Sequence, residues 1–179
     1  MFKALWLNIS LILISFVTFA QVEKEIDPPF NIKTITFVQN NQNSIPLFSL
    51  NDPFEIQFDD LYGNEANYYY EIVHCNYDWK HSDLSKNEYL QGFDGIRIQE
   101  YTNSLNTLQL FSHYRIGFPN KNTRLLVSGN YMIKILNEDR EVVFSRKLML
   151  YEDLVSVPMQ IKRARTLSNI NYKQNLDFS

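Results

Sequence analysis

The 179 residues of this chain are enough for one full domain with some remainder, and an apolar content of 45% can supply a packed core. The formal net charge of −3 and the lack of a basic stripe in the sequence exclude nucleic acid as a main partner. The single cysteine, Cys75, excludes an internal disulfide bond.

The first twenty residues have the composition of a secretory signal peptide. Lys3 precedes an apolar run from Ala4 to Ala20, and small residues end the run, with Thr18 at the minus-three position. Several polar residues interrupt the run, which makes it poor for a membrane span of about 20 apolar residues. An uncleaved anchor is the alternative. We expect a signal peptide over residues 1–20 and an exported mature chain.

A β domain is predicted for residues 31–154, after a charged lead-in over residues 21–30. Its first strands are expected at Asn31–Val38, Leu47–Leu50 and Phe54–Asp59. In the third of these strands, apolar side chains alternate with polar ones at a period of two, which is typical of a half-buried strand.

Residues 68–79 are predicted to form the central strand of the domain, because β-branched and aromatic residues dominate this stretch. Large side chains fall on both of its faces, with Tyr70 and Ile72 on one and Val73 on the other. A strand with two apolar faces is expected to be covered above and below. We therefore expect this strand to lie in the interior of a sheet.

The segment Lys80–Gly92 is polar and is predicted to be a loop or one helical turn that folds back through its apolar end. Extended structure is expected again at Ile96–Tyr101. Leu108–Phe118 is then predicted to form one long strand or two short ones, which end at Pro119.

The stretch Ser128–Tyr131 places a glycine two residues before a tyrosine that opens an alternating strand. This spacing is that of a tyrosine corner in immunoglobulin-like sandwiches. A turn at Asn137–Arg140 then leads to a partner strand, like the last hairpin of such a domain. The fold class is therefore predicted as all-β, an antiparallel immunoglobulin-like β-sandwich preceded by a signal peptide.

Residues 155–179 differ in character from the sandwich. A further strand is predicted around Val157–Ile161, and the basic cluster at 162–165 is interpreted as a solvated linker, with a contact to anionic lipid as the alternative. Residues 175–179 resemble the opening of a strand without a partner. We interpret residues 155–179 as a linker and the start of a truncated second domain.

The sequence has one metal-like cluster, made of His74, Cys75, Asp78 and His81. Neighbouring residues of a strand point to opposite faces, so His74 and Cys75 cannot bind one ion without a bulge. A packed histidine and a packed thiol are the preferred interpretation, and we predict no metal site.

Other chemistry is also rejected. The acidic pairs Asp59-Asp60 and Glu138-Asp139 lie at predicted turns, where a solvated role is usual. His113 together with a serine is the remaining candidate for a dyad. No nucleophile elbow, phosphate loop or zinc helix occurs in the sequence. We predict no catalytic residue, no cofactor and no small-molecule substrate, so the chain is not expected to be an enzyme.

Aromatic side chains are the remaining candidates for a binding surface. Trp79, Tyr89, Phe93 and Tyr114 are predicted contacts to a partner, provided that two or three of them lie together at one end of the sandwich. Burial in the core is the alternative for each of them.

A long run of specific residues extends from Tyr70 to Phe93. It contains YEIVHCNYDW at 70–79, SDL at 82–84 and EYLQGF at 88–93. Together with SGNYMIKIL at 128–136, this pattern resembles the N-terminal domain of the type IX secretion system plug protein family, over roughly residues 28–155.

The resemblance implies an exported β-protein of Gram-negative bacteria that lies in the periplasm, peripheral to the inner face of the outer membrane. It also implies a partner, the outer-membrane translocon barrel of the type IX system, whose periplasmic end the protein would close. This role needs a rigid body with a complementary surface and requires no catalysis. Family members are longer than this chain, which leaves open which portion makes the contact.

Two other classes of protein remain open at this point. An exported carbohydrate-binding β-sandwich module would need two or three coplanar exposed rings. A hydrolase would need His74 or His113 in a cleft with a base or nucleophile within reach.

Overall fold

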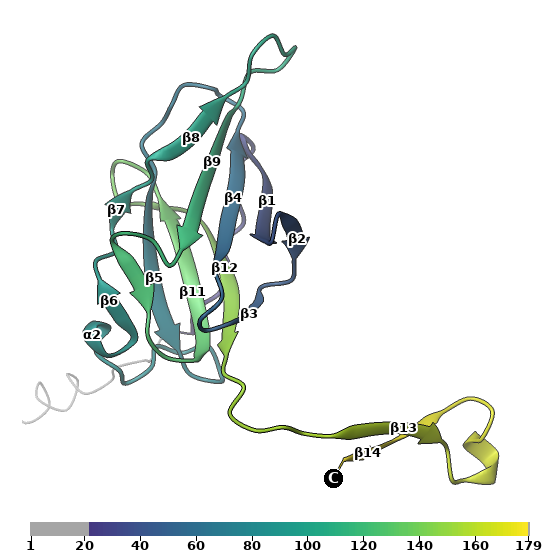
Figure 1. Cartoon of the computed structure of the whole chain (residues 1–179). Coiled ribbons are helices and arrows are strands. Elements are labelled where there is room, and N and C mark those ends of the chain that lie inside the picture. Colours follow the sequence, from purple (N-terminus) through teal and green to yellow (C-terminus); the bar gives the residue numbers. More distant parts are fainter. Residues whose placement is uncertain (1–21, 179) are drawn as a thin grey trace, which may run out of the picture.

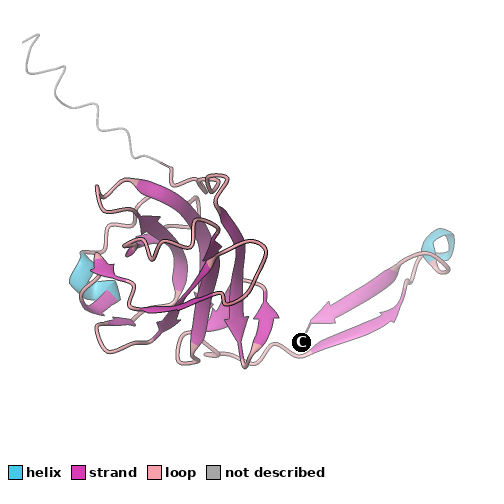
Figure 2. Ribbon diagram, turned by 90° about the horizontal axis from the view of Figure 1, so that it is seen from above, coloured by secondary structure: helices cyan, strands magenta, loops and turns pink. Residues whose placement is uncertain are grey.

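The computed structural model of the chain describes residues 22–178, so the predicted signal peptide over 1–20 lies outside the described residues. Within the described part, two five-stranded sheets pack face to face, and a two-stranded hairpin stands apart from them near the C-terminus (Figure 1). The view from above shows the strands of the sandwich curving around a common interior (Figure 2). At the level of two packed sheets, the prediction of a β-sandwich is confirmed.

The first sheet has the strand order β2-β1-β4-β9-β8, and all of its pairings are antiparallel. Its members are β1 (Ile32–Gln39), β2 (Gln42–Ser44), β4 (Phe54–Asp60), β8 (Glu100–Asn103) and β9 (Ser112–Phe118). β1 and β4 confirm the strands predicted at 31–38 and 54–59. In β4 the apolar residues Phe54, Ile56 and Phe58 are buried, as the period of two in the sequence requires.

The second sheet has the strand order β3-β12-β11-β5-β7. Its members are β3 (Leu47–Ser49), β5 (Tyr69–Cys75), β7 (Ile96–Arg97), β11 (Gly129–Leu136) and β12 (Val142–Tyr151). β3 pairs with β12 in parallel, so the prediction of a wholly antiparallel sandwich is wrong at this edge. β2 and β4 both belong to the first sheet. Between them, the chain crosses to the second sheet, where β3 forms an edge strand.

β5 lies inside its sheet, between β11 and the short β7. The strand was predicted to continue to Trp79 but ends at Cys75, because residues 76–79 form a turn. The Trp79 N–H donates to the Asn76 C=O at 3.0 Å, and Trp79 has a φ of +63°. The chain then returns beside β5, where His81 bridges to Cys75. The turn preference of Asn76 overrides the strand preference of its aromatic neighbours.

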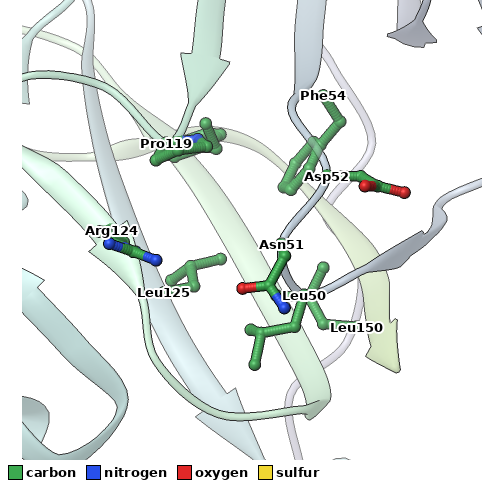
Figure 3. A pocket seen from close by; sticks show the side chains of 9 residues that line it. Leu50, Asn51, Asp52, Phe54, Pro119, Arg124, Leu125 and Leu150 are labelled. Atoms are coloured by element: carbon green, nitrogen blue, oxygen red, sulfur yellow. The ribbon is translucent and has the colours of Figure 1, made fainter. Parts of the chain in front are cut away.

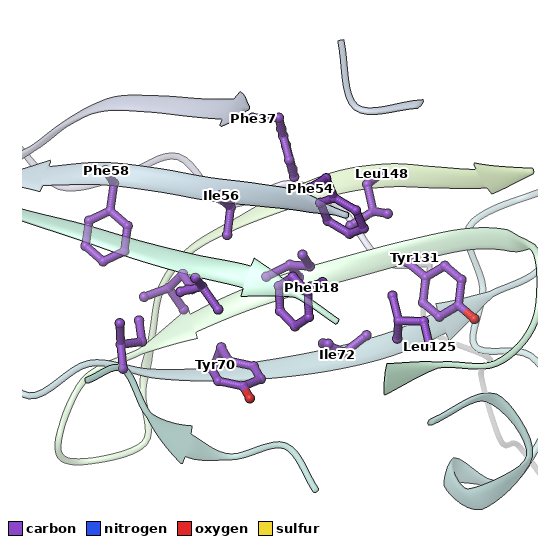
Figure 4. Close-up of a cluster of buried hydrophobic side chains, with 14 of the residues drawn as sticks. Phe37, Phe54, Ile56, Phe58, Tyr70, Ile72, Phe118, Leu125, Tyr131 and Leu148 are labelled. Atoms are coloured by element: carbon purple, nitrogen blue, oxygen red, sulfur yellow. The ribbon is translucent and has the colours of Figure 1, made fainter. Parts of the chain in front are cut away.

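Aromatic rings fill the core between the two sheets (Figure 4). The rings of Phe58 and Tyr114 stack with their centroids 5.1 Å apart, and Tyr68 meets both of them edge-on. Each such pair adds about 0.5–1.5 kcal/mol to the stabilisation from burial. Tyr70 and Ile72, which the sequence places on one face of β5, both point into this core.

A buried carboxylate anchors one end of the core. Asp60 is fully buried and accepts hydrogen bonds from the Asn31 side chain at 2.8 Å and from the Tyr68 hydroxyl at 2.9 Å. Burial and the bond to this carboxylate raise the pKa of Tyr68. The prediction that the pair Asp59-Asp60 is merely solvated is therefore wrong, because Asp59 in turn lies 2.6 Å from His113.

The predicted last hairpin is present as the antiparallel pair β11 and β12. The Tyr131 hydroxyl donates to the C=O of Val127, four residues upstream, at 2.7 Å. This is the hydrogen bond that a tyrosine corner makes. Burial also raises the pKa of Tyr131, in agreement with a phenol enclosed by apolar groups.

The remaining elements lie outside the two sheets. They are α2 (Lys86–Tyr89), β6 (Leu90–Gly92), β10 (Thr123–Leu125), β13 (Met159–Arg163), the 3-10 turn Leu167–Asn169 and β14 (Gln174–Phe178). β6 pairs with β10, and the predicted helical turn is confirmed as α2. β14 pairs with β13, so the strand expected near residue 175 does have a partner. Among residues 22–178, no helix is long and apolar enough to span a membrane.

The strand predicted for Leu108–Phe111 is absent, and β9 begins only at Ser112. Two hydrogen bonds close the preceding loop at its base. The Ser104 N–H donates to the Phe111 C=O at 2.9 Å, and the Phe111 N–H donates to the Ser104 hydroxyl at 2.9 Å. This closure leaves Leu108 in an irregular loop at one end of the sandwich.

Candidate functional site

The four aromatic residues predicted to contact a partner do not form one surface. Tyr114 is fully buried, and its hydroxyl donates to the Ala66 C=O at 2.9 Å. Tyr89 is also buried in the core, so both residues are corrected from surface contacts to core residues. Trp79 is half-buried on the outer face of the second sheet, and only Phe93 is largely exposed.

The segment that carries the recognisable sequence pattern closes the edge of β5. Beyond β7, the Asp94 carboxylate accepts a hydrogen bond from the Ile72 N–H at 2.9 Å. The Tyr89 hydroxyl donates to the C=O of the same residue at 3.3 Å. Lys86 lies 2.6 Å from Asp94 and balances its charge. Tyr89 of the motif and Asp94 directly after it therefore occupy backbone groups that an open strand would offer to another chain.

The backbone at Gly92 shows why the motif has a glycine at this position. Gly92 has a φ of +95°, and a Cβ at this position would collide with the C=O of Asn122, directly before the facing strand β10. The hydroxyl of Thr123 donates to the C=O of Phe93 next to it. The small β6–β10 sheet thus needs a residue without a side chain at this position.

His74 is a packed residue of the inner face. Its ring lies between Tyr89 and Tyr131, at centroid distances of 5.6 and 4.9 Å. Its Nδ1 lies 2.8 Å from the Ser82 hydroxyl. Burial lowers the pKa of His74, so the neutral ring is favoured.

Gly129 makes room for this histidine ring. A Cβ on Gly129 would lie 2.5 Å from His74 Nε2, and the φ of +145° is one that other residues rarely adopt. The histidine of the first motif and the glycine of the SGNY motif are therefore one packing unit. His74 with Ser82 is not a hydrolytic dyad, because the ring nitrogen on the Gly129 side is buried without a partner in the described part of the chain.

The candidate metal cluster is divided between the two faces of the sheet. Cys75 packs with Val73 and Met132 on the outer face, away from His74. Burial raises the pKa of its thiol to about 11, which makes the thiol a poor nucleophile and metal ligand. Within residues 22–178, no group of three or more potential ligands is arranged to hold a metal ion.

The lead-in segment crosses the outer face and contacts the returning loop. The Glu23 carboxylate lies 2.7 Å from Lys134 and 2.6 Å from His81. Burial raises the pKa of Glu23, but the hydrogen bonds from these two partners outweigh burial and lower the pKa overall. The Glu23 N–H also donates to the Trp79 C=O at 2.7 Å. The lead-in is thus attached to the folded domain.

His113 does not form a catalytic dyad in the described residues either. Its Nδ1 lies 2.6 Å from the Asp59 carboxylate, on the outer face of the first sheet. A carboxylate holds the ring, but no serine hydroxyl bonds to the ring among residues 22–178. This arrangement is a cross-strand pair of the kind that stabilises sheets.

The cavities are poor small-molecule sites. The pocket shown in Figure 3 is lined by apolar residues such as Phe54, Pro119 and Leu150 and has a volume of about 30 Å³. Sites for small molecules usually have about 300–1,000 Å³. A wider groove of about 380 Å³ runs along Arg97, Glu100 and neighbouring residues, but it is open and its one ring, Tyr70, is buried.

Two exposed apolar features were not found from the sequence. One is the loop between β8 and β9, whose three leucines are exposed. The other is one face of the β13–β14 hairpin, formed by Met159, Ile161, Leu176 and Phe178. The available signal for the loop was its lack of charge, since residues 101–114 contain no aspartate, glutamate, lysine or arginine. Leu108 and Leu110 fall within the strand that the sequence predicts at Leu108–Phe118.

The fold and these sites define a β-sandwich protein whose distinctive residues serve packing and edge closure. The sequence matches the family described as "Type 9 secretion system plug protein 1st domain" over residues 32–152. The chain therefore belongs to this family, which confirms the resemblance found in the sequence. This membership associates the chain with a secretion system of the cell envelope.

A solved structure is similar to the chain over most of its length. The crystal structure of a hypothetical protein from Parabacteroides merdae is 33% identical, with a TM-score of 0.76. The match covers 88% of this chain and 41% of that chain. This chain therefore spans less than half of the length of that protein. No curated protein matches the sequence.

Proposed function

We propose that this chain is a non-catalytic component of the type IX secretion system that binds the periplasmic end of the outer-membrane translocon barrel and closes it. The observation that carries the proposal is the family match over residues 32–152. The partner is the barrel itself, and the location is the periplasm at the inner face of the outer membrane. The predicted signal peptide over residues 1–20 supports export to that compartment.

The mechanical properties of the sandwich support such a role. A plug must keep its shape when it contacts a partner. Stacked aromatic rings and the hydrogen bonds to the buried Asp60 carboxylate connect the core of the sandwich and support such rigidity. The edge of β5 is sealed by Asp94 and Tyr89, which disfavours strand addition to this edge. At this side of the sandwich, we expect contact through side chains and loops.

Two structural assignments belong to this proposal. The hydrogen bond from Tyr131 to Val127 supports an immunoglobulin-like class for the sandwich over residues 31–154. Residues 155–179 are proposed to lead into a second domain. The apolar face of the β13–β14 hairpin supports this assignment, because such a face is normally covered. The larger size of the Parabacteroides merdae protein is also in agreement with it.

The alternative of a carbohydrate-binding module has no observation in its favour. Such modules stack sugars on exposed rings that lie side by side. In the described part of the chain, every close pair of aromatic rings includes at least one buried ring, and the exposed rings of Tyr77 and Phe93 are unpaired.

The test is co-purification of the tagged full-length protein from cells that contain the type IX system. The translocon barrel is expected in the eluate in amounts that exceed those from an untagged strain. Repeated absence of the barrel, with the tagged protein itself recovered in folded form, would overturn the proposal.

A further inference from the structure

The loop of residues 104–111, between β8 and β9, presents leucine side chains to solvent. Leu105 is 84% exposed and Leu110 is 57% exposed, while Leu108 extends fully into solvent. The Ser104–Phe111 hydrogen bonds close the loop at its base. The leucines are therefore displayed by a defined loop rather than by a free end of the chain.

The neighbouring turn between β4 and β5 extends this surface. A Cβ on Gly63 would lie 3.0 Å from the Cβ of Leu110, so the turn and the loop are in contact. The Gln109 side chain donates to the Leu61 C=O at 2.8 Å and ties the two segments together. Tyr62, in the same turn, is 68% exposed. We call Tyr62, Leu105, Leu108 and Leu110 the leucine end.

The leucine end carries no charge of its own. Between Glu100 and Arg115, the sequence contains no acidic residue, lysine or arginine, and its one histidine there, His113, is paired with Asp59. The core of a protein–protein interface is similarly depleted of charged residues. Exposed leucines without interspersed charges are unfavourable on a free surface and are typical of a covered one.

The leucine end lies opposite the point where the chain leaves the sandwich. In Figure 1 the loop after β8 projects at the top, whereas β12 leads from the bottom toward β13. The proposed second domain would follow the hairpin and start at the opposite end. This placement leaves the leucine end accessible to a separate molecule.

We propose that the leucine end is the surface through which this protein docks on an uncharged, apolar protein wall, the periplasmic rim of the translocon barrel. This inference rests on the function proposed above and deepens it by assigning the contact to particular residues. Leu105 and Leu108 insert into the partner, and Tyr62 with Leu110 packs around them.

The partner is a protein surface rather than the hydrocarbon of a membrane. The backbone of the loop is irregular, and the polar side chains of Asn106, Thr107 and Gln109 lie between its leucines in the sequence. Irregular backbone exposed to lipid hydrocarbon does not occur, because each unsatisfied polar group costs several kcal/mol there. A protein wall can supply hydrogen bonds to these groups. The loop also lacks the lysine or arginine that anionic lipid headgroups attract.

The test compares two double variants of the full-length protein in its own cells. In the first, Leu105→Ser and Leu108→Ser remove the two most exposed of the three leucines in the loop. In the matched control, Ile45→Ser and Leu47→Ser remove apolar side chains of the sandwich that are 71% and 41% exposed at the start of β3. Retention of the translocon barrel by the tagged protein is expected to fall at least about tenfold for the loop variant, because central apolar anchors dominate binding energy. The control is expected to retain the barrel like the wild type.

The outcomes separate the two proposals. If the wild type does not retain the barrel, the proposed function fails. If the wild type and the loop variant retain it equally, the function stands and the docking surface is overturned. Wild-type binding to vesicles of phosphatidylethanolamine and phosphatidylglycerol, lost in the loop variant, would overturn the choice of a protein partner. A purified dimer that becomes a monomer in the loop variant would assign the surface to a second copy of the chain. Unchanged melting temperatures show that both variants are folded.

Discussion

The motif segment over residues 70–94 and the leucine loop over residues 104–111 are opposites in sequence and in structure. The motif segment is rich in aromatic, histidine and glycine residues, and most of these serve packing or close the edge of β5. The leucine loop has no motif, yet it exposes the apolar surface that a partner would cover. A recognisable sequence pattern can therefore mark the requirements of a fold, while the surface that we propose for the partner lies outside that pattern.

The largest loss in the free energy of unfolding is expected from Gly129→Ala, because Gly129 packs against His74. The new Cβ would lie 2.5 Å from His74 Nε2, at a φ of +145°. The free energy of unfolding should fall by about 2–4 kcal/mol, from strain and overpacking together. Urea denaturation followed by tryptophan fluorescence measures this change.

Gly117→Ala is the matched control for this substitution. Its Cβ would meet only the flexible Glu55 side chain at 3.8 Å, so little change is expected. Equal losses for the two variants would show that the packing of His74 against Gly129 has no special importance.

A smaller loss in the free energy of unfolding is expected from Asp94→Ala. This change leaves the Ile72 N–H without its acceptor and Lys86 without its partner at 2.6 Å. An unsatisfied buried backbone group costs about 1–3 kcal/mol. Asp139→Ala, at an exposed turn position, is the control and should be neutral. Faster hydrogen exchange at Ile72 in the Asp94 variant would locate the effect, and unchanged exchange there would contradict edge closure.

Tyr131→Phe tests the tyrosine corner, and its expected effect on stability is smaller still. It removes the hydroxyl that donates to Val127 at 2.7 Å and keeps the buried ring. The expected loss in the free energy of unfolding is about 1 kcal/mol. Tyr77→Phe, at the exposed turn after β5, should change nothing. A Tyr131 variant as stable as the wild type would show that the corner does not stabilise the hairpin.

A pH effect is expected from His74, whose pKa burial lowers below its ordinary value of 6.5. The unfolded chain binds a proton at a higher pH than the native chain, so stability should fall as the pH drops below 6.5 and level off below the native pKa. His74→Phe should flatten this part of the profile. An NMR titration of the ring checks the pKa directly, and a native pKa above 6.5 would contradict the burial argument.

The smallest effect on stability is expected in the leucine loop. Leu108→Ser removes a side chain that has no packing partner in the folded chain, so the free energy of unfolding should change by less than about 0.5 kcal/mol. Thermal unfolding followed by circular dichroism is sufficient to measure this. A loss above 1 kcal/mol would mean that the loop supports the fold, as the motif segment does.

Much of the sandwich could be predicted because its information is local. The alternation in Phe54–Asp59 and the glycine two residues before Tyr131 specified a strand and a corner that the structure contains. The burial of Tyr89 and Tyr114 could not be predicted, because both depend on how distant strands pack. The turn at Asn76 was not predicted because the strand preference of several aromatic neighbours was weighted above the turn preference of one asparagine.

The candidate site was less accessible to sequence reasoning than the fold. Leu108 is exposed because the hydrogen bond between Ser104 and Phe111 closes its loop. Hydrophobic periodicity in the sequence does not reveal this bond. Leu108 and Leu110, at a spacing of two, were interpreted as part of a strand. The buried role of Asp60 was also missed, because its partner Tyr68 lies across a turn whose geometry the sequence does not reveal.

Site-specific photocrosslinking in living cells tests the central claim most directly. A photoreactive phenylalanine would replace either Leu108, in the leucine loop, or Tyr77, which is 91% exposed at the tip of the motif segment. The account predicts a crosslink to the translocon barrel from position 108 and none from position 77. A crosslink to the barrel from position 77 alone would contradict it, because the motif segment would then be the contact surface.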